Sequence, residues 1–185
     1  MTKLHNAKYR FGFTGTLDGS KTHKWVLEGL FGDCEQVTKT DSLIKEGYLS
    51  KFRIKILLCK HAPQHFETYH DEMEYLVSHR GRNNLIKNLV KDIDGNSLVL
   101  FNYIEKHGEP LYELINSTID PDRKLFFVHG GTDVEDREEV RQITETEQNA
   151  IIVACYVTFS TGINLKRLHN IIFASPSKSR IRNLQ

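Results

Sequence analysis

Small hydroxyl side chains follow a short apolar run near the carboxyl end of the sequence. The run Ala150–Ala154 is rich in β-branched residues, and Thr158, Ser160, Thr161 and Gly162 come after it. An unbroken apolar run of this length is typical of a strand buried on both faces. Ligands of open α/β sheets bind at the carboxyl ends of such strands, where hydroxyls and free N–H groups suit a phosphate. The stretch predicts either a phosphate-binding loop or an ordinary loop that caps a helix.

The elements that would position this loop alternate between strands and helices. Five apolar runs predict strands at Ile54–Leu58, Ser97–Phe101, Lys124–Val128, Ala150–Ala154 and Asn170–Ala174. Amphipathic stretches predict helices at His65–His79, Asn83–Lys91, Pro110–Asn116 and Thr132–Thr144. The last helix would start with a capping box formed by Thr132 and Glu135, and another helix would start at Ser177. This alternation predicts an α/β fold with a parallel sheet flanked by helices on both faces.

The amino-terminal part has a less regular pattern. It predicts short strands at Arg10–Thr14 and Gln36–Lys39 and helices at Thr22–Phe31 and Asp41–Glu46. The regular alternation starts only later, so the sequence predicts a domain boundary between Gly47 and Lys51.

Composition limits the classes of function. The 185 residues include 25 Lys and Arg against 24 Asp and Glu, which leaves no overall basic field for nucleic acid. Any polyanion site must therefore be a local patch. The three cysteines are far apart, which argues against a disulfide framework or a zinc site and predicts no metal site. No apolar run has membrane-spanning length, so we expect an intracellular protein without a membrane partner.

The stretch Gly15–Thr22 differs by one residue from the P-loop pattern G-x-x-x-x-G-K-[ST]. Ser20 stands where the last glycine would be, and Lys21 follows it. A P-loop enzyme also needs an acidic residue at the end of a neighbouring strand to help hold Mg²⁺. The residues at or just after the ends of the predicted strands are not acidic: Cys59, Asn102, His129, Cys155 and Ser175. The pattern therefore favours a P-loop only weakly.

Taken in order, five stretches resemble motifs from the second half of a superfamily 2 DNA helicase motor of the phage recombination-repair type. They correspond to motif III, motif IV, the "H-G … R-E" stretch before motif V, motif V itself and the lead-in to motif VI. The matching residues are Phe13–Leu17, Leu98–Asn102, Val128–Gly131 with Arg137 and Glu138, Thr158–Asn164, and Ser177–Gln185. The resemblance covers nearly the whole chain.

The resemblance implies that the chain is a fragment of a two-domain motor. Residues 1–48 would be the tail of the first RecA-like domain with motif III and a linker. Residues 49–185 would be the second RecA-like domain, the helicase C-terminal domain, truncated before the end of motif VI. The intact motor would use ATP and Mg²⁺ held with the missing first RecA-like domain, and no cofactor is expected on this fragment. The implied setting is the cytoplasm of a phage-infected bacterial cell, in recombination, repair or replication-fork processing.

The resemblance also implies two groups of site residues. Nucleotide contact and coupling between domains would involve Thr14, Gly15, Thr16, Gly162 and Asn164. Sequence-independent contact with the DNA backbone would involve Asn102, His129, Gly130, Thr158, Ser160 and Thr161. No complete catalytic set is expected in this chain.

Two other functions remain open on the sequence. One is a P-loop NTPase or kinase that uses Lys21. The other is a RecA-like module that binds nucleic acid without any ATPase activity.

We expect no ATP hydrolysis by this chain alone, because it has neither an acidic strand end nor the arginine stretch of motif VI. Single-turnover hydrolysis of radiolabelled ATP is the measurement, with Lys21→Ala as the comparison. Hydrolysis well above a protein-free blank that Lys21→Ala abolishes would instead establish the P-loop function.

Overall fold

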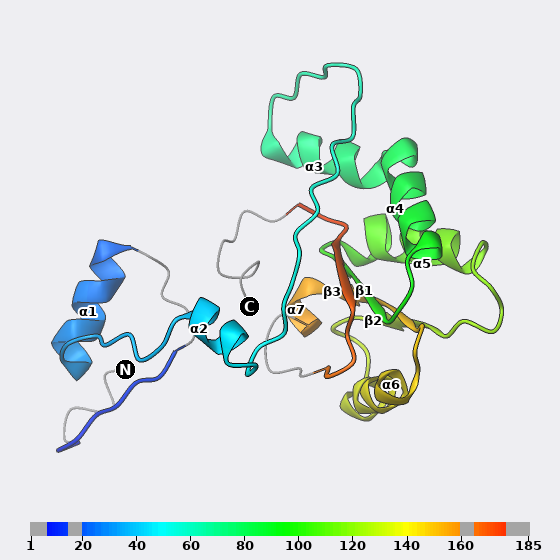
Figure 1. Cartoon of the computed structure of the whole chain (residues 1–185). Helices are drawn as coiled ribbons and strands as arrows, with labels where there is room; N and C mark the ends of the chain where they lie inside the picture. The colour runs from blue at the N-terminus through cyan, green and yellow to red at the C-terminus, as the bar shows by residue number, and fades with distance from the viewer. Residues whose placement is uncertain (1–6, 15–19, 160–164, 177–185) are drawn as a thin grey trace. The chain divides into compact units, whose positions relative to one another are not determined.

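The computed structural model describes residues 7–14, 20–159 and 165–176 and forms two compact units (Figure 1). The first unit runs to Lys60 and the second begins at His61. In the first unit, α1 (Lys21–Phe31) and α2 (Thr40–Lys45) contain no buried residue. Among the described helices, none is long and apolar enough to cross a membrane. The boundary between two RecA-like domains expected near residue 48 stays a prediction.

The second unit is built on a four-stranded parallel sheet. Its strands are β1 (Ser97–Phe101), β2 (Leu125–Val128), β3 (Ile151–Cys155) and β4 (Asn170–Phe173), in the spatial order β2-β3-β1-β4. Ser97 is paired with Ile151 on one side and Asn170 on the other. Every residue of the two central strands is buried, as their unbroken apolar runs predict.

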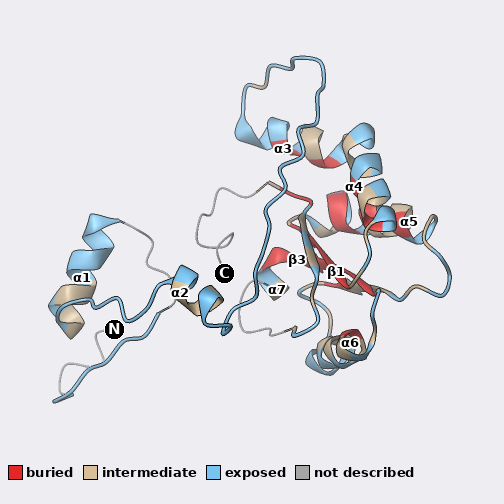
Figure 2. Ribbon diagram, viewed as in Figure 1, coloured by how far each residue is buried: buried red, intermediate tan, exposed pale blue. Residues whose placement is uncertain are grey.

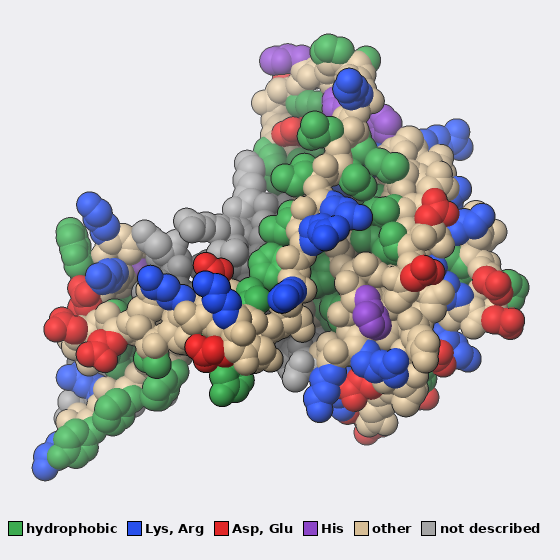
Figure 3. Space-filling view, viewed as in Figure 1, with side chains coloured by type: hydrophobic (Ala, Val, Ile, Leu, Met, Phe, Trp, Pro, Cys, Tyr) green, Lys and Arg blue, Asp and Glu red, His purple; other side chains and the backbone are tan. Residues whose placement is uncertain are grey.

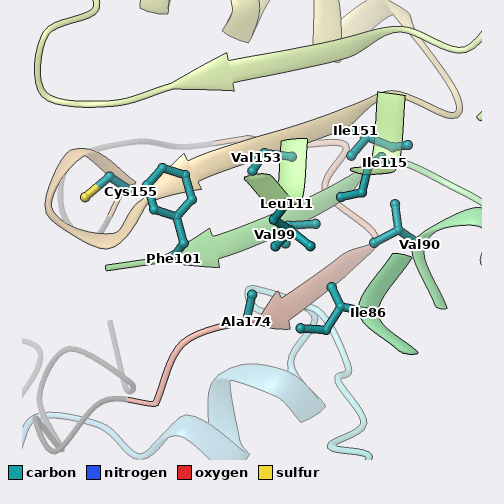
Figure 4. Close-up of a cluster of buried hydrophobic side chains, with 10 residues drawn as sticks. All are labelled: Ile86, Val90, Val99, Phe101, Leu111, Ile115, Ile151, Val153, Cys155 and Ala174. Atoms are coloured by element: carbon teal, nitrogen blue, oxygen red, sulfur yellow. The ribbon is translucent and has the colours of Figure 1, made fainter. Parts of the chain in front are cut away.

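Helices cover both faces of this sheet. On one face, α4 (Arg80–Asp92) and α5 (Glu109–Asn116) pack against alternate side chains of β1 and β3, such as Phe101 and Val153 (Figures 2 and 4). On the other face, α6 (Val134–Thr146) and α7 (Tyr156–Phe159) lie against the alternate set, which includes Leu98 and Ile152. The predicted fold class is therefore confirmed. A further helix, α3 (Tyr69–Ser78), buries Met73 and Val77.

The predicted strand Ile54–Leu58 is wrong. The segment has no strand pairing in the structure, and Ile54, Ile56 and Leu58 are 75%, 81% and 85% exposed. Lys51, Arg53 and Lys55 alternate with apolar residues in this stretch of the sequence. Hydrophobic and positively charged side chains are therefore both exposed along it (Figure 3). A strand inside a parallel sheet is covered on both faces and cannot accommodate that alternation. The strands expected at Arg10–Thr14 and Gln36–Lys39 are likewise exposed segments without regular structure.

The predicted capping box is also wrong. The N-cap of helix α6 is Asp133, one residue later than the expected Thr132, and its side chain makes no capping hydrogen bond. The Thr132 hydroxyl instead accepts a hydrogen bond from the backbone N–H of His129, at 3.0 Å. The hydroxyl is therefore used to close the preceding turn. The helix expected from Ser177 lies outside the described residues.

One buried amide joins the amino-terminal ends of three strands. The Asn96 side chain has no exposed surface. Its Nδ2 lies 2.8 to 2.9 Å from the carbonyl oxygens of Thr144, Glu147 and Arg167. Its Oδ1 accepts from the Ala150 N–H at 2.8 Å. These bonds connect the start of β1 to the end of α6, the start of β3 and the segment that leads to β4.

The backbone around Asn96 is shaped for the same contacts. Gly95 has a φ of 90°, and a Cβ there would lie 2.9 Å from the His169 side chain. That close approach lets His169 Nδ1 accept from the Asn96 N–H at 3.0 Å. The Asn96 carbonyl oxygen in turn accepts from the N–H groups of His169 and Asn170. Glycine is therefore required at position 95 by both its conformation and its neighbour.

We expect Asn96→Ala to lower the free energy of unfolding by about 3 kcal/mol, because several buried backbone groups lose their partner. Urea unfolding followed by circular dichroism is the measurement. Asn116→Ala at the exposed end of α5 is the matched control and should change stability by less than about 0.5 kcal/mol. Equal effects of the two substitutions would contradict this role for Asn96.

Candidate nucleic-acid interface

The carboxyl ends of the four parallel strands form one rim of the sheet. Phe101 is paired with Cys155, Leu100 with Phe173, and Val128 with Ala154. One residue further along, Asn102 follows β1 and His129 follows β2, while Thr158 lies three residues beyond β3. The structure thus brings three of the sequence-predicted DNA-binding residues, Asn102, His129 and Thr158, to the same edge.

A tight turn follows β2 at this rim. The Gly131 N–H donates to His129 Nδ1 at 3.1 Å, and the Thr132 N–H donates to the His129 carbonyl oxygen at 3.1 Å. The imidazole is therefore held against its own turn. Among the described residues other than its chain neighbours, none has a heavy atom within 4 Å of a Cβ added at Gly130. None of those residues would have to move for a ligand to approach the Gly130 backbone from that side.

Strand β3 leads directly into the single turn of α7 rather than into a loop. Thr158 belongs to this helical turn and not to a loop, contrary to the expectation for Thr158–Gly162. Within the described structure, Thr158 Oγ1 is buried and has no hydrogen-bond partner. Ser160 and Thr161 lie outside the described residues.

The ends of β1 and β4 are tied together at the rim. The Asn102 N–H donates to Ser175 Oγ at 3.1 Å, and Asn102 Nδ2 donates to the Pro176 carbonyl oxygen at 3.0 Å. The Tyr156 hydroxyl donates to the Ser175 carbonyl oxygen at 3.1 Å. Three strand ends therefore meet at Ser175. In the sequence, only its position after a predicted strand marks Ser175.

A buried histidine is hydrogen-bonded to the Ser175 hydroxyl. His107 lies in a π-helical turn, η2 (Ile104–Gly108), and has no exposed surface. Its Nδ1 is 2.9 Å from Ser175 Oγ and its Nε2 is 3.3 Å from Asn83 Oδ1. The turn packs closely on β1, since a Cβ at Gly108 would lie 2.5 Å from the Phe101 ring. Sequence reasoning missed His107, because nothing local marks the ring as buried.

The contacts of His107 define which ring nitrogen carries the proton. Asn83 Nδ2 donates to the Val77 carbonyl oxygen at 2.8 Å, so Asn83 Oδ1 is the acceptor for the ring. His107 Nε2 therefore carries the proton and Nδ1 accepts from the Ser175 hydroxyl. Burial, and then the positive charge of Arg82, lower the pKa of His107 from 6.5 to about 4. The Arg82 guanidinium itself donates to the Ala174 carbonyl oxygen.

The residues predicted for nucleotide contact are not brought together in the described part of the chain. Thr14 lies in an exposed segment of the first unit. Gly15, Thr16, Gly162 and Asn164 lie outside the described residues. In the part of the chain that the structure covers, no group of three or more His, Cys, Asp or Glu side chains could hold a metal ion.

The P-loop alternative lacks the strand that its geometry requires. Residues 7–14, ahead of Lys21, form no strand. Ser20 is the N-cap of α1, and its hydroxyl accepts from the His23 N–H at 3.2 Å. Ser20 and Lys21 therefore form an ordinary helix start rather than the strand–loop–helix of a P-loop.

We expect acid to destabilise the fold through His107. The unfolded chain protonates this ring below pH 6.5, whereas the folded chain keeps it neutral down to about pH 4. This contribution to stability is complete above pH 6.5 and lost as the pH falls toward 4, by an amount on the order of 3 kcal/mol. Urea unfolding at pH 7 and pH 4.5 measures it. The loss should be smaller in His107→Gln, and an equal loss would contradict the assignment.

Comparisons with known proteins agree with the fold and the motifs. No family model matches the chain. The sequence is 30% identical over 191 aligned positions to the ATP-dependent DNA helicase UvsW of Enterobacteria phage T4, which covers 98% of this chain and 37% of the relative. The crystal structure of T4 UvsW matches with a TM-score of 0.56 and 34% identity, over 64% of this chain and 24% of that one.

The chain thus spans 37% of the length of the curated relative. The helicase resemblance predicted from the motifs is confirmed: this chain is similar to part of the phage DNA helicase UvsW, over nearly its whole length in sequence and over 64% of its length in structure.

Proposed function

We propose that this chain supplies the second motor domain of an ATP-dependent superfamily 2 DNA helicase or translocase. The 30% identity to UvsW over 98% of the chain supports a helicase function. In this proposal residues 1–48 are the tail of the first RecA-like domain, and the sheet belongs to the second. The motor acts on phage DNA in the cytoplasm of the infected cell, in recombination, repair or replication-fork processing.

The observation that carries this proposal is the shared rim at the carboxyl ends of the strands. Asn102, His129 and Thr158 come from three different strands and reach one edge of the sheet. The rim offers the backbone of Gly130, where no described residue beyond its chain neighbours lies within 4 Å of an added Cβ. Amides, hydroxyls and backbone N–H groups bind phosphate oxygens and fix the position of a strand without reading its sequence. The rim is therefore suited to gripping a DNA backbone.

The nucleotide site needs a partner domain. ATP with Mg²⁺ supplies the free energy for movement when it is bound between two RecA-like domains. The first domain would provide the Walker A lysine and the acidic Mg²⁺ ligand. In this chain Thr14, Gly15 and Thr16 would couple the domains, and Gly162 and Asn164 would face the nucleotide. The rim residues, with Ser160 and Thr161, would hold DNA phosphates while the domains move.

Binding by this chain alone should be weak and should ignore base sequence. Its net charge is only +1, and it carries half of a strand-binding cleft. Non-specific affinities typically fall around 10⁻⁴–10⁻⁶ M, and half a site should lie at or beyond the weak end of that range. Each neutralised phosphate of a single strand contributes about 0.7 to the dependence of log affinity on log salt. We therefore expect a shallow salt dependence.

Gly130→Ala tests whether DNA approaches this rim. The added methyl group meets no described residue beyond its chain neighbours, so the fold should be kept, but it would crowd a phosphate at the backbone. We expect the dissociation constant for a short single strand to rise about threefold to tenfold, which corresponds to one lost hydrogen bond. Chemical-shift changes in an NMR titration at low salt are the measurement.

The matched control is Gly29→Ala in α1, where an added Cβ also meets no atom within 4 Å. This control should leave the dissociation constant unchanged. Two results would contradict the DNA-binding role of the rim. One is an unchanged affinity of Gly130→Ala, and the other is a set of shift changes that clusters around Gly15–Thr22 instead of Asn102, His129 and Gly130.

A further inference from the structure

We propose that His107 is a positioning residue of the rim, which holds Asn102 in its DNA-binding orientation through Ser175. This inference rests on the proposed function, because it assigns a support to the same DNA-binding edge. His107 lies beneath the rim and has no exposed surface, so it does not touch DNA itself. Its effect on DNA binding would pass through the Ser175 hydroxyl, which lies between His107 and the Asn102 N–H.

The hydrogen bonds from Asn83 through His107 and Ser175 to Asn102 have a defined order of donors and acceptors. Asn83 Oδ1 accepts from His107 Nε2 at 3.3 Å, and the Ser175 hydroxyl donates to His107 Nδ1 at 2.9 Å. Because its proton points to the imidazole, Ser175 Oγ presents its lone pairs to the Asn102 N–H, 3.1 Å away. A neutral imidazole thus fixes the hydroxyl as an acceptor for Asn102. An apolar side chain at position 107 would leave the hydroxyl free to rotate.

The Asn102 side chain is fixed in the same way. One N–H of its amide donates to the Pro176 carbonyl oxygen at 3.0 Å. An amide carries two N–H groups, so the other can still donate to a phosphate. Both anchors of Asn102 lie on the segment Ser175–Pro176 after β4. The orientation of this donor therefore depends on where His107 and Tyr156 hold that segment.

The contacts link elements that are far apart in the chain. Asn83 lies on α4, His107 in η2, and Ser175 after β4. If the network only held the fold together, its loss would lower stability without acting specifically through Asn102. If it positions Asn102, its loss should weaken DNA binding only while the Asn102 amide is present. This difference can be measured with a thermodynamic cycle.

The experiment compares Ser175→Ala, Asn102→Ala and the double variant by NMR titration of the full chain with a short single strand. We expect Ser175→Ala to raise the dissociation constant about threefold to tenfold, as expected for one lost hydrogen bond. In the Asn102→Ala background the same substitution should cause less than a twofold further change. His107→Leu should behave as Ser175→Ala does. His107→Gln, whose amide retains both a donor and an acceptor, should stay within about twofold of the unsubstituted chain.

A measurement on the unsubstituted chain tests the positioning without relying on any variant to fold. A long-range ¹H–¹⁵N spectrum at pH 7 should show His107 as the neutral tautomer with its proton on Nε2. A charged ring or a proton on Nδ1 would overturn the positioning. An unchanged affinity in Ser175→Ala, or equal losses with and without the Asn102 amide, would also overturn it. If the unsubstituted chain fails to bind DNA even at low salt, the proposed function itself is wrong.

Discussion

The Asn96 amide is the constraint on which the arrangement of the sheet depends. A parallel sheet has no hairpins to fix the register of neighbouring strands, so long-range contacts must do it. Asn96 bonds to Ala150 ahead of β3 and, through its backbone, to Asn170 at the start of β4. It also binds the carbonyl oxygen of Thr144 near the end of α6. One residue, through its side chain and its backbone, thus aligns β1 with both of its neighbours. Since the strands run in the same direction, this alignment also sets which residues meet at the opposite rim.

The two ends of the sheet use buried polar groups in different ways. At the amino-terminal end, the Asn96 amide satisfies several backbone groups directly. At the carboxyl end, the contacts run through the ring of His107 and the hydroxyl of Ser175. An amide keeps its donors and acceptors at every ordinary pH, whereas an imidazole changes them when it takes up a proton. Each end thus includes one imidazole acceptor, His169 Nδ1 for the Asn96 N–H and His107 Nδ1 for the Ser175 hydroxyl, but only the His107 contact leads to Asn102 at the rim.

The parts of the fold that depend on local pattern could be predicted from the sequence. Unbroken apolar runs identified β1 and β3, and the helicase-like motifs led to Asn102 and His129 at the rim. The strand predicted at Ile54–Leu58 does not form, because an apolar run suits a strand but does not supply a partner for it. The roles of Asn96 and His107 could not be predicted, since the partners of their side chains lie up to 71 and 68 residues away in the chain. Tertiary context alone buries them.

The strand order has a consequence for how the chain acquires its fold. Central strand β1 pairs with β3 and β4, both of which come much later in the sequence. During synthesis, Ser97–Phe101 leaves the ribosome without either neighbour and exposes four consecutive apolar residues, Leu98–Phe101, until Ile151–Cys155 has been made. Such late, non-local pairing slows folding and leaves a chain open to association with other chains. Helices α4 and α5, which lie on either side of β1 in the sequence, are available before β3 to cover one of its faces.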